Sequence, residues 1–200
     1  MSKYLKAIFN IFKNYKFYSF QLLFYEFIFF IFYNHKFNRF KYLNSNFLSD
    51  SIPCPFLFLI KINKFISNNN VKHICDLGSG YGKILYFFGI LKKLKIDGVE
   101  FDIEIFNSSY SLQNNNINIF NDDILKFDFE KKNYDLLIIN DPLKDKEDFR
   151  KLILKIKMIK KDMFIIFINL DFKKKDIMFN SFKILDKFEP SNNKNIFYCK

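Results

Sequence analysis

All five glycines of this 200-residue chain lie between residues 78 and 98, and three of them stand in one heptapeptide. The heptapeptide, residues 76–82, reads Asp-Leu-Gly-Ser-Gly-Tyr-Gly and follows a segment typical of a buried strand. Glycine tolerates positive φ and lets a ligand lie against bare backbone, which a strand-to-helix turn around a cofactor requires. A helix expected over 82–94 would present its free N–H groups and the positive end of its dipole to that ligand.

The spacing of these glycines distinguishes two kinds of cofactor. A dinucleotide-binding turn has the pattern Gly-x-Gly-x-x-Gly, whereas this chain has Asp-x-Gly-x-Gly-x-Gly. A carboxylate at the end of the first strand would repel a pyrophosphate, but it suits a ligand that carries an ammonium and a sulfonium group. We therefore expect S-adenosylmethionine rather than NAD as the cofactor, bound by Asp76, Gly78, Ser79, Gly80 and Gly82.

Three further polar sites follow predicted strands. Glu100 ends the second strand of the unit, about 20 residues after the glycine-rich turn, where a carboxylate can bind ribose hydroxyls. In the segment 121–124, Asn-Asp-Asp-Ile, a carboxylate can accept from an adenine amino group while the isoleucine contacts the ring. Asn140 and Asp141 come directly after an apolar run, 136–139, at the end of another predicted strand. All these sites fall at the carboxyl ends of predicted parallel strands, where open α/β sheets bind ligands.

The elements that must position these residues alternate between strand and helix from residue 71 onward. The patterns predict strands near 71–77, 95–100, 116–121, 134–140 and 162–169, and helices near 82–94, 103–113, 147–158 and 172–180. Such alternation indicates a parallel sheet with crossover helices. Two final strands, 182–188 and 195–199, are joined by a short loop over 189–193, so they form an antiparallel hairpin with one reversed strand.

The chain divides into three parts: a hydrophobic, aromatic-rich arm (1–48), a proline-containing connector with a helix over 56–66 (49–70), and the main domain (71–200). The densest apolar stretch, 17–33, contains one charge, Glu26. Its 17 residues reach about 25 Å as a helix, short of the ~30 Å hydrocarbon slab. A helix in the membrane interface and a helix packed on the main domain are favoured equally over a true span, and a partner-binding arm is the remaining alternative.

The distribution of charge and the cysteine content bear on the partners, metal content and cellular location of the protein. Residues 1–70 hold nine Lys and Arg against two acids, so most of the basic excess lies outside the predicted site. That region could serve as a nucleic-acid arm. The three cysteines are scattered, without a Cys-x-x-Cys pair or Cys/His cluster, so we expect no metal site and a reducing, cytoplasmic location. The oligomeric state is not predicted.

Residues 71–200 resemble the class I, seven-strand S-adenosylmethionine-dependent methyltransferases. Asp-Leu-Gly-Ser-Gly-Tyr-Gly matches the first motif of that family, Gly-Val-Glu its acidic second-strand motif, and Asn-Asp-Asp-Ile its adenine-side acid. The resemblance implies a Rossmann-like three-layer sandwich in which the glycine-rich turn lines the methionine half of the cofactor. It further implies that Glu100 binds the ribose and that Asp123, with Ile124 beside it, binds the adenine.

A narrower likeness concerns the methyl acceptor. The proline-bearing segment 51–55 before a helix, followed by Asp-Leu-Gly-Ser-Gly-x-Gly-Lys-Ile, looks like the small membrane-associated protein-lysine methyltransferases. This likeness implies methyl transfer to a nitrogen of a protein lysine, with Asn140 or Asp141 orienting the amine and 17–33 contacting a membrane peripherally. Two alternatives remain: an RNA methyltransferase that uses the basic N-terminal region, and a non-catalytic cofactor-binding or membrane-docking protein.

Overall fold

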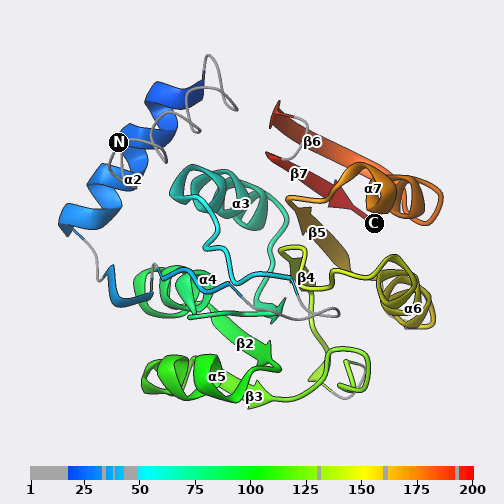
Figure 1. Cartoon of the computed structure of the whole chain (residues 1–200), viewed down its shortest axis with the longest axis horizontal. Coiled ribbons are helices and arrows are strands. Elements are labelled where there is room, and N and C mark those ends of the chain that lie inside the picture. Colours follow the sequence, from blue (N-terminus) through cyan, green and yellow to red (C-terminus); the bar gives the residue numbers. More distant parts are fainter. Residues whose placement is uncertain are drawn as a thin grey trace.

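The computed structural model of the chain describes residues 18–32, 35–37, 39–42, 49–129, 132–159, 162–191 and 194–200. Within these residues, seven strands form one sheet: β1 (His73–Leu77), β2 (Lys95–Glu100), β3 (Ile117–Asn121), β4 (Leu136–Ile139), β5 (Phe164–Ile168), β6 (Ile184–Ser191) and β7 (Lys194–Cys199). The strand order is β3-β2-β1-β4-β5-β7-β6 (Figure 1). Strands β1 to β5 pair in parallel, and β7 runs antiparallel to both of its neighbours.

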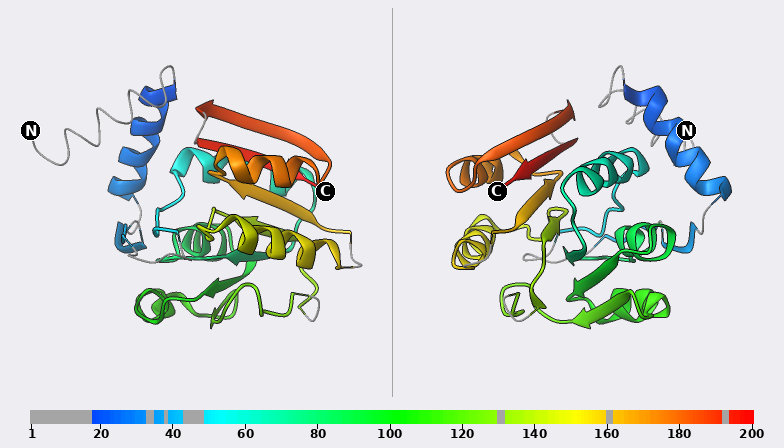
Figure 2. Two further views of the ribbon diagram at one scale, coloured as in Figure 1. Left: turned by 45° about the vertical axis from the view of Figure 1, so that its right-hand side comes forward. Right: turned by 180° about the vertical axis from the view of Figure 1, so that it is seen from behind.

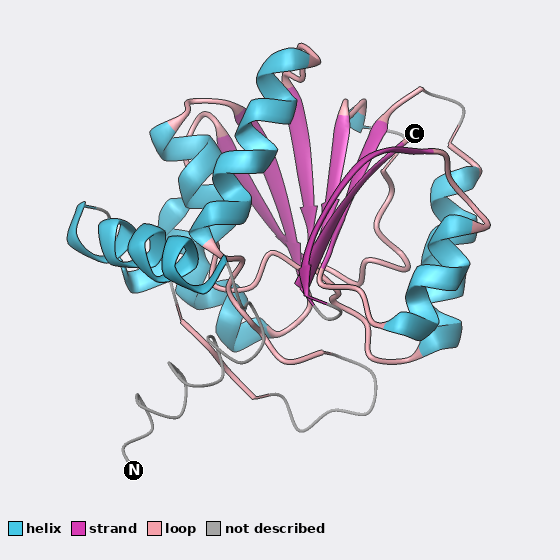
Figure 3. Ribbon diagram, turned by 90° about the horizontal axis from the view of Figure 1, so that it is seen from above, coloured by secondary structure: helices cyan, strands magenta, loops and turns pink. Residues whose placement is uncertain are grey.

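Helices cover both faces of the sheet (Figure 3). They are α2 (Ser19–Phe32), α3 (Phe56–Asn68), α4 (Lys83–Leu85), α5 (Ile103–Ser109), α6 (Lys146–Lys157) and α7 (Phe172–Phe179). Successive side chains along each strand point to opposite faces of the sheet and pack in two separate cores. Ile74 packs with α3 and α4 on one face, and Leu77 packs with α6 and α7 on the other. This alternation makes a three-layer sandwich from strands that are apolar on both faces.

The predicted fold class is confirmed, with two local differences. The helix expected over 82–94 is a single α turn that continues as a π-helical turn over Tyr86–Leu91. The change accompanies a close approach to the sheet, because a Cβ on Gly89 would lie 2.3 Å from Cγ1 of Ile117. Strand β6 runs to Ser191 instead of ending at Phe188. It is an edge strand, so the missing N–H of Pro190 costs little there.

Part of the N-terminal arm is a helix that packs on the main domain. Leu22 and Phe29 of α2 are buried, and α2 lies beside α3, on the opposite side of the sheet from α6 and α7 (Figure 2). The ends of the apolar stretch, residues 17 and 33, lie outside the described residues. In the part of the chain that the structure describes, no helix has the length and hydrophobicity needed to cross a membrane.

The three cysteines lie in different parts of the fold. Cys54 precedes α3, Cys75 lies in the central strand β1, and Cys199 ends β7. All three are free thiols with at most 1% of their surface exposed. Burial away from water raises the pKa of each thiol above its ordinary value. They are therefore small apolar core residues rather than nucleophiles.

Candidate active site

The glycine-rich turn connects β1 to α4 through three residues in the left-handed region. The φ angles of Gly78, Gly80 and Gly82 are +79°, +55° and +86°. The N–H groups of Gly78 and Ser79 donate to the carbonyl of Val99 at 2.9 and 3.0 Å, so the turn is fixed to the end of β2. Only glycine fits this path at low cost.

Neighbouring segments approach the turn closely. A Cβ on Gly78 would lie 2.4 Å from Cβ of Pro142, just after β4. A Cβ on Gly80 would lie 2.9 Å from Oγ of Ser51, in the segment before α3. The turn is therefore enclosed both by the end of β4 and by a segment that precedes the whole sheet.

Glu100 lies at the end of β2 and faces this turn. Its Oε2 accepts a hydrogen bond from the N–H of Gly80, and its Oε1 accepts one from the N–H of Asp102, both at 2.8 Å. The side chain is buried, which raises the pKa of the carboxyl, while these two N–H groups act in the opposite direction. A carboxylate held by backbone donors keeps lone pairs for the hydroxyls of a ligand.

Asp76 is the most unusual polar group of the site. It is fully buried, and neither carboxylate oxygen has a hydrogen-bond partner among the described residues. Burial, with a smaller contribution from the negative charge of Glu100, raises the pKa of Asp76 to about 8. The hydroxyl of Ser79 is likewise buried without a partner in that part of the chain. Such groups beneath the turn fit a ligand that brings positive charge and hydrogen-bond donors.

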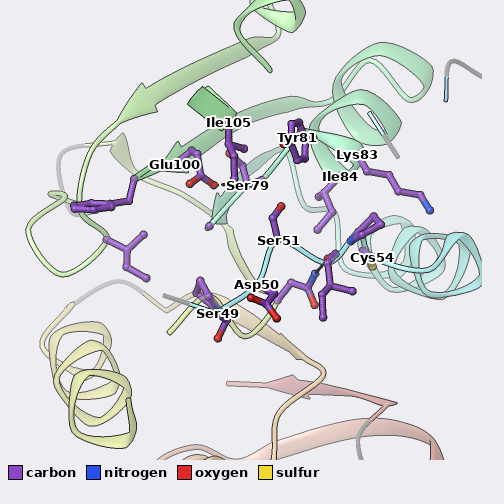
Figure 4. A pocket seen from close by; sticks show the side chains of 18 of the residues that line it. Ser49, Asp50, Ser51, Cys54, Ser79, Tyr81, Lys83, Ile84, Glu100 and Ile105 are labelled. Atoms are coloured by element: carbon purple, nitrogen blue, oxygen red, sulfur yellow. Dashed lines mark hydrogen bonds between the residues drawn. The ribbon is translucent and has the colours of Figure 1, made fainter. Parts of the chain in front are cut away.

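A cavity of about 300 Å³ opens over the turn, at the low end of the range for small-molecule pockets. Figure 4 shows Glu100 and Ser79 on one side, with Ser49, Asp50 and Ser51 facing them from the opposite wall. The predicted site residues that line the cavity are Gly78, Ser79, Gly80, Glu100, Asp123, Ile124 and Asn140. They come from four different strand ends, so the fold brings distant parts of the sequence to one cavity.

Three predicted site residues lie outside the cavity wall that the described residues form. Asp76 lies in β1, beneath the turn. Gly82 begins α4, where a Cβ would lie 2.5 Å from the side chain of Leu112. Asp141 accepts a hydrogen bond from Lys174 at 2.6 Å in a buried ion pair. Desolvation raises the pKa of Asp141 to about 6, although the charge of Lys174 opposes this.

Both polar atoms of the Asn140 amide form hydrogen bonds within the protein. Its Nδ2 donates to the carbonyl of Ile52 at 3.1 Å, and its Oδ1 accepts from Nδ2 of Asn169 at 2.7 Å. The residue therefore fastens residue 52 to the ends of β4 and β5. Because the Oδ1 of an amide has two lone pairs, one acceptor position of this cavity-lining residue is left. The catalytic roles of Asn140 and Asp141 stay predictions.

Sequence reasoning missed one wall of the cavity. This wall is the part of the connector that precedes α3: residues 49–54 all line the cavity, together with Phe37 and Arg39 from the arm. The N–H of Ser49 donates to the carbonyl of Pro142 at 3.1 Å, and Ser51 pairs with Lys41 in an isolated bridge. The prolines predicted only that the connector is extended. Nothing in its residue types indicated where it would lie.

The chain is similar to known proteins in structure, but not in sequence. No protein-family model matches the chain, and no curated protein gives a significant sequence match. The methyltransferase domain of bacterial CtHen1 superposes with a TM-score of 0.59 at 13% identity, covering 72% of this chain and 96% of that one. Magnesium protoporphyrin IX methyltransferase from Synechocystis PCC 6803, solved with bound SAM, gives 0.58 at 14% identity, covering 72% and 77%.

N-methyltransferase NodS from Bradyrhizobium japonicum WM9 gives a TM-score of 0.56 at 12% identity, covering 72% of this chain and 90% of that one. The chain has the Rossmann-like methyltransferase fold. The similarity covers the sheet architecture, including the reversed β7, and identities this low carry the fold alone.

Proposed function

We propose that the protein is an S-adenosylmethionine-dependent methyltransferase that transfers a methyl group to a nitrogen nucleophile, with a protein lysine as the favoured acceptor. The observation that carries the proposal is the convergence of the glycine-rich turn, Glu100 and Asp123 on one cavity at the carboxyl edge of the sheet. In open α/β sheets this edge binds the ligand. The carboxyl group of Asp76, which lies beneath the turn without a hydrogen-bond partner among the described residues, favours a cationic ligand over a pyrophosphate.

Each part of the cavity has a role in this proposal. The bare backbone of Gly78 and Gly80 lines the end for the methionine moiety. The carboxylate of Glu100 accepts hydrogen bonds from ribose hydroxyls, and Asp123 accepts from the adenine amino group while Ile124 contacts the ring. S-adenosylmethionine supplies a methyl group bonded to a positively charged sulfur, so the chain needs no electrophile of its own.

The remaining task of the protein is to align a neutral amine and to exclude water. The connector covers the cavity, which raises the effective concentration of a bound acceptor. A lysine must lose its proton before it attacks, and a partly apolar wall that includes Ile52, Pro53 and Leu143 lowers the pKa of an entering ammonium. The second lone pair of Asn140 Oδ1 can then orient the amine.

The test has two steps. Titration calorimetry with S-adenosylmethionine and S-adenosylhomocysteine should detect binding to the wild-type protein and none to Gly80→Arg, whose side chain would fill the turn. Cell extract is then incubated with the protein and methyl-labelled cofactor. Label in protein that yields methylated lysine on hydrolysis supports the proposal. Label in RNA, with affinity that falls steeply with salt, favours the RNA alternative. Binding without transfer leaves only a cofactor-binding protein.

Peripheral contact of α2 with an anionic lipid surface is a second, separate proposal. The outward side of α2 exposes Phe20, Phe24, Phe27 and Phe30 by more than half, and four lysines precede this helix in the sequence. Aromatic side chains beside lysines suit the interface of such a membrane. We expect sedimentation with phosphatidylserine vesicles, weakened by Phe27→Asp but not by the matched control Phe172→Asp on α7. Equal sedimentation of all three proteins would contradict this contact.

A further inference from the structure

Glu26 is the single charged residue of α2, and it points into the protein. Both of its carboxylate oxygens accept hydrogen bonds from Nζ of Lys83, at 3.2 and 3.0 Å. Oε1 also accepts from the N–H of Phe56, the first residue of α3. One carboxylate thus joins three elements that are far apart in the sequence: the arm, the helix after the connector, and the helix after the glycine-rich turn.

Lys83 is a buried cation in the wall of the cavity. Its side chain is 3% exposed, and its Nζ lies 4.7 Å from the ring centre of the fully buried Phe29. Lys83 follows the glycine-rich turn directly and lines the cavity, and its chain extends from there away from Ser51 (Figure 4). A lysine in such a place requires a partner, because an unpaired buried charge is strongly unfavourable.

The arm also contacts the cavity elsewhere. Phe37 stacks on Tyr86 with ring centres 5.3 Å apart, and the guanidinium of Arg39 lies 5.9 Å from the ring centre of Tyr81. Lys41 pairs with Asp102 at 3.1 Å, next to the backbone that holds Glu100. These contacts follow the edge of the cavity from the glycine-rich turn to the end of β2, so the described part of the arm belongs to the binding site.

We propose that Glu26 is a positioning residue for the cofactor, which holds the helix after the glycine-rich turn and neutralises Lys83 so that the site accepts a sulfonium. This inference rests on the proposed function. The Coulomb energy falls only as 1/r, so an unbalanced charge in the wall acts on a bound sulfonium without touching it. S-adenosylhomocysteine lacks only the transferred methyl group and the positive charge of the sulfur, and therefore serves as the reference ligand with a neutral sulfur.

The experiment measures, by calorimetry at pH 6.5, the affinity for S-adenosylmethionine divided by the affinity for S-adenosylhomocysteine. Glu26→Gln leaves the positive charge of Lys83 unbalanced, so this ratio should fall about threefold or more. Lys83→Met leaves the negative charge of Glu26 instead, so the ratio should rise. The double variant should return it to the wild-type value. Glu147→Gln, which breaks an exposed ion pair with Arg150 on α6, is the matched control and should leave it unchanged.

A purely structural role would weaken both ligands equally and would leave the ratio constant. The opposite signs in the two single variants are therefore the decisive result, and circular dichroism confirms that each variant is folded at the assay temperature. If Glu26→Gln does not fold, Lys83→Met and the double variant still test the direction in which the affinity ratio changes. An unchanged ratio in variants that bind overturns the inference and leaves the proposed function standing. Failure of the wild-type protein to bind either ligand refutes the proposed function and the inference together.

Discussion

Replacing Asp76 by Asn tests whether a carboxyl group is held neutral beneath the glycine-rich turn. The ordinary pKa of an aspartate is near 3.8, and burial raises that of Asp76 to about 8. As the pH rises through this interval, the unfolded chain loses the proton while the folded chain keeps it, so the free energy of unfolding falls. The loss amounts to about 1.4 kcal/mol per pH unit, or about 3 to 4 kcal/mol between pH 5 and pH 8.

Asp76→Asn introduces a side chain of nearly the same shape that does not titrate. The unfolding free energy of the variant therefore lacks this fall with rising pH. We expect the difference in unfolding free energy between variant and wild type to move by about 3 to 4 kcal/mol in favour of the variant from pH 5 to pH 8. Urea unfolding at the two pH values measures this change, and the comparison cancels the contributions of titrating groups that do not interact with Asp76. Any difference in desolvation between the buried amide and the buried neutral carboxyl is the same at both pH values, so it does not affect the change.

A constant difference across this range would refute the reasoning, because it would mean that Asp76 is ionised throughout. The same group gives a second measurement. A positive ligand lowers the pKa of Asp76, so wild-type protein at pH 7 should release a proton on binding S-adenosylmethionine. Calorimetry in two buffers of different ionisation enthalpy detects this release, and Asp76→Asn should show none of it.

Three other substitutions test single features of the site. Gly78→Ala combines positive φ with a Cβ 2.4 Å from that of Pro142. We therefore expect urea unfolding to show a loss of about 1 to 3 kcal/mol in the free energy of unfolding. A variant as stable as the wild type would contradict the geometry of the turn. Glu100→Gln removes a charged acceptor, and calorimetry should find about tenfold weaker binding of S-adenosylmethionine, whereas equal binding would place the ribose elsewhere. Asp141→Asn leaves the ammonium of Lys174, 3% exposed, with only Asp171 at 3.6 Å as an ion-pair partner. Urea unfolding should report a loss of about 2 kcal/mol in the free energy of unfolding, and no loss would mean that the pair with Asp141 contributes nothing to stability.

The sequence predicted the main domain well because its signals are local. Strand β2 begins and ends where the alternation of residue types places it, and the other strands of the sheet differ from their predicted ranges by a few residues. The glycines also act locally, since a positive φ is a property of one residue. The turn they form, together with Glu100, therefore lies where the spacing indicated. The π-helical turn after α4 depends on contact with another strand, and no local pattern contains it.

The contacts of the site that depend on distant residues were not predicted. Asn140 holds the carbonyl of Ile52 across 88 positions of sequence, and Lys83 meets Glu26 across 57. Residue types do not encode such pairings, because many other partners are chemically equivalent. One signal was available in part: a lone acid in the apolar stretch 17–33 suggests a cationic partner if that stretch is buried, and a lysine directly after the glycine-rich turn was a candidate.

Because the three cysteines are buried, the reaction rates of their thiols report on local opening of the protein. A thiol reacts with an alkylating reagent only when its surroundings separate, so each rate measures how often one region opens. Cys54 reports on the connector, Cys75 on the middle of the sheet and Cys199 on the reversed strand. Mass spectrometry of timed iodoacetamide pulses would therefore resolve three separate motions in the unmodified chain, and a ligand that holds the connector closed would protect Cys54 most strongly.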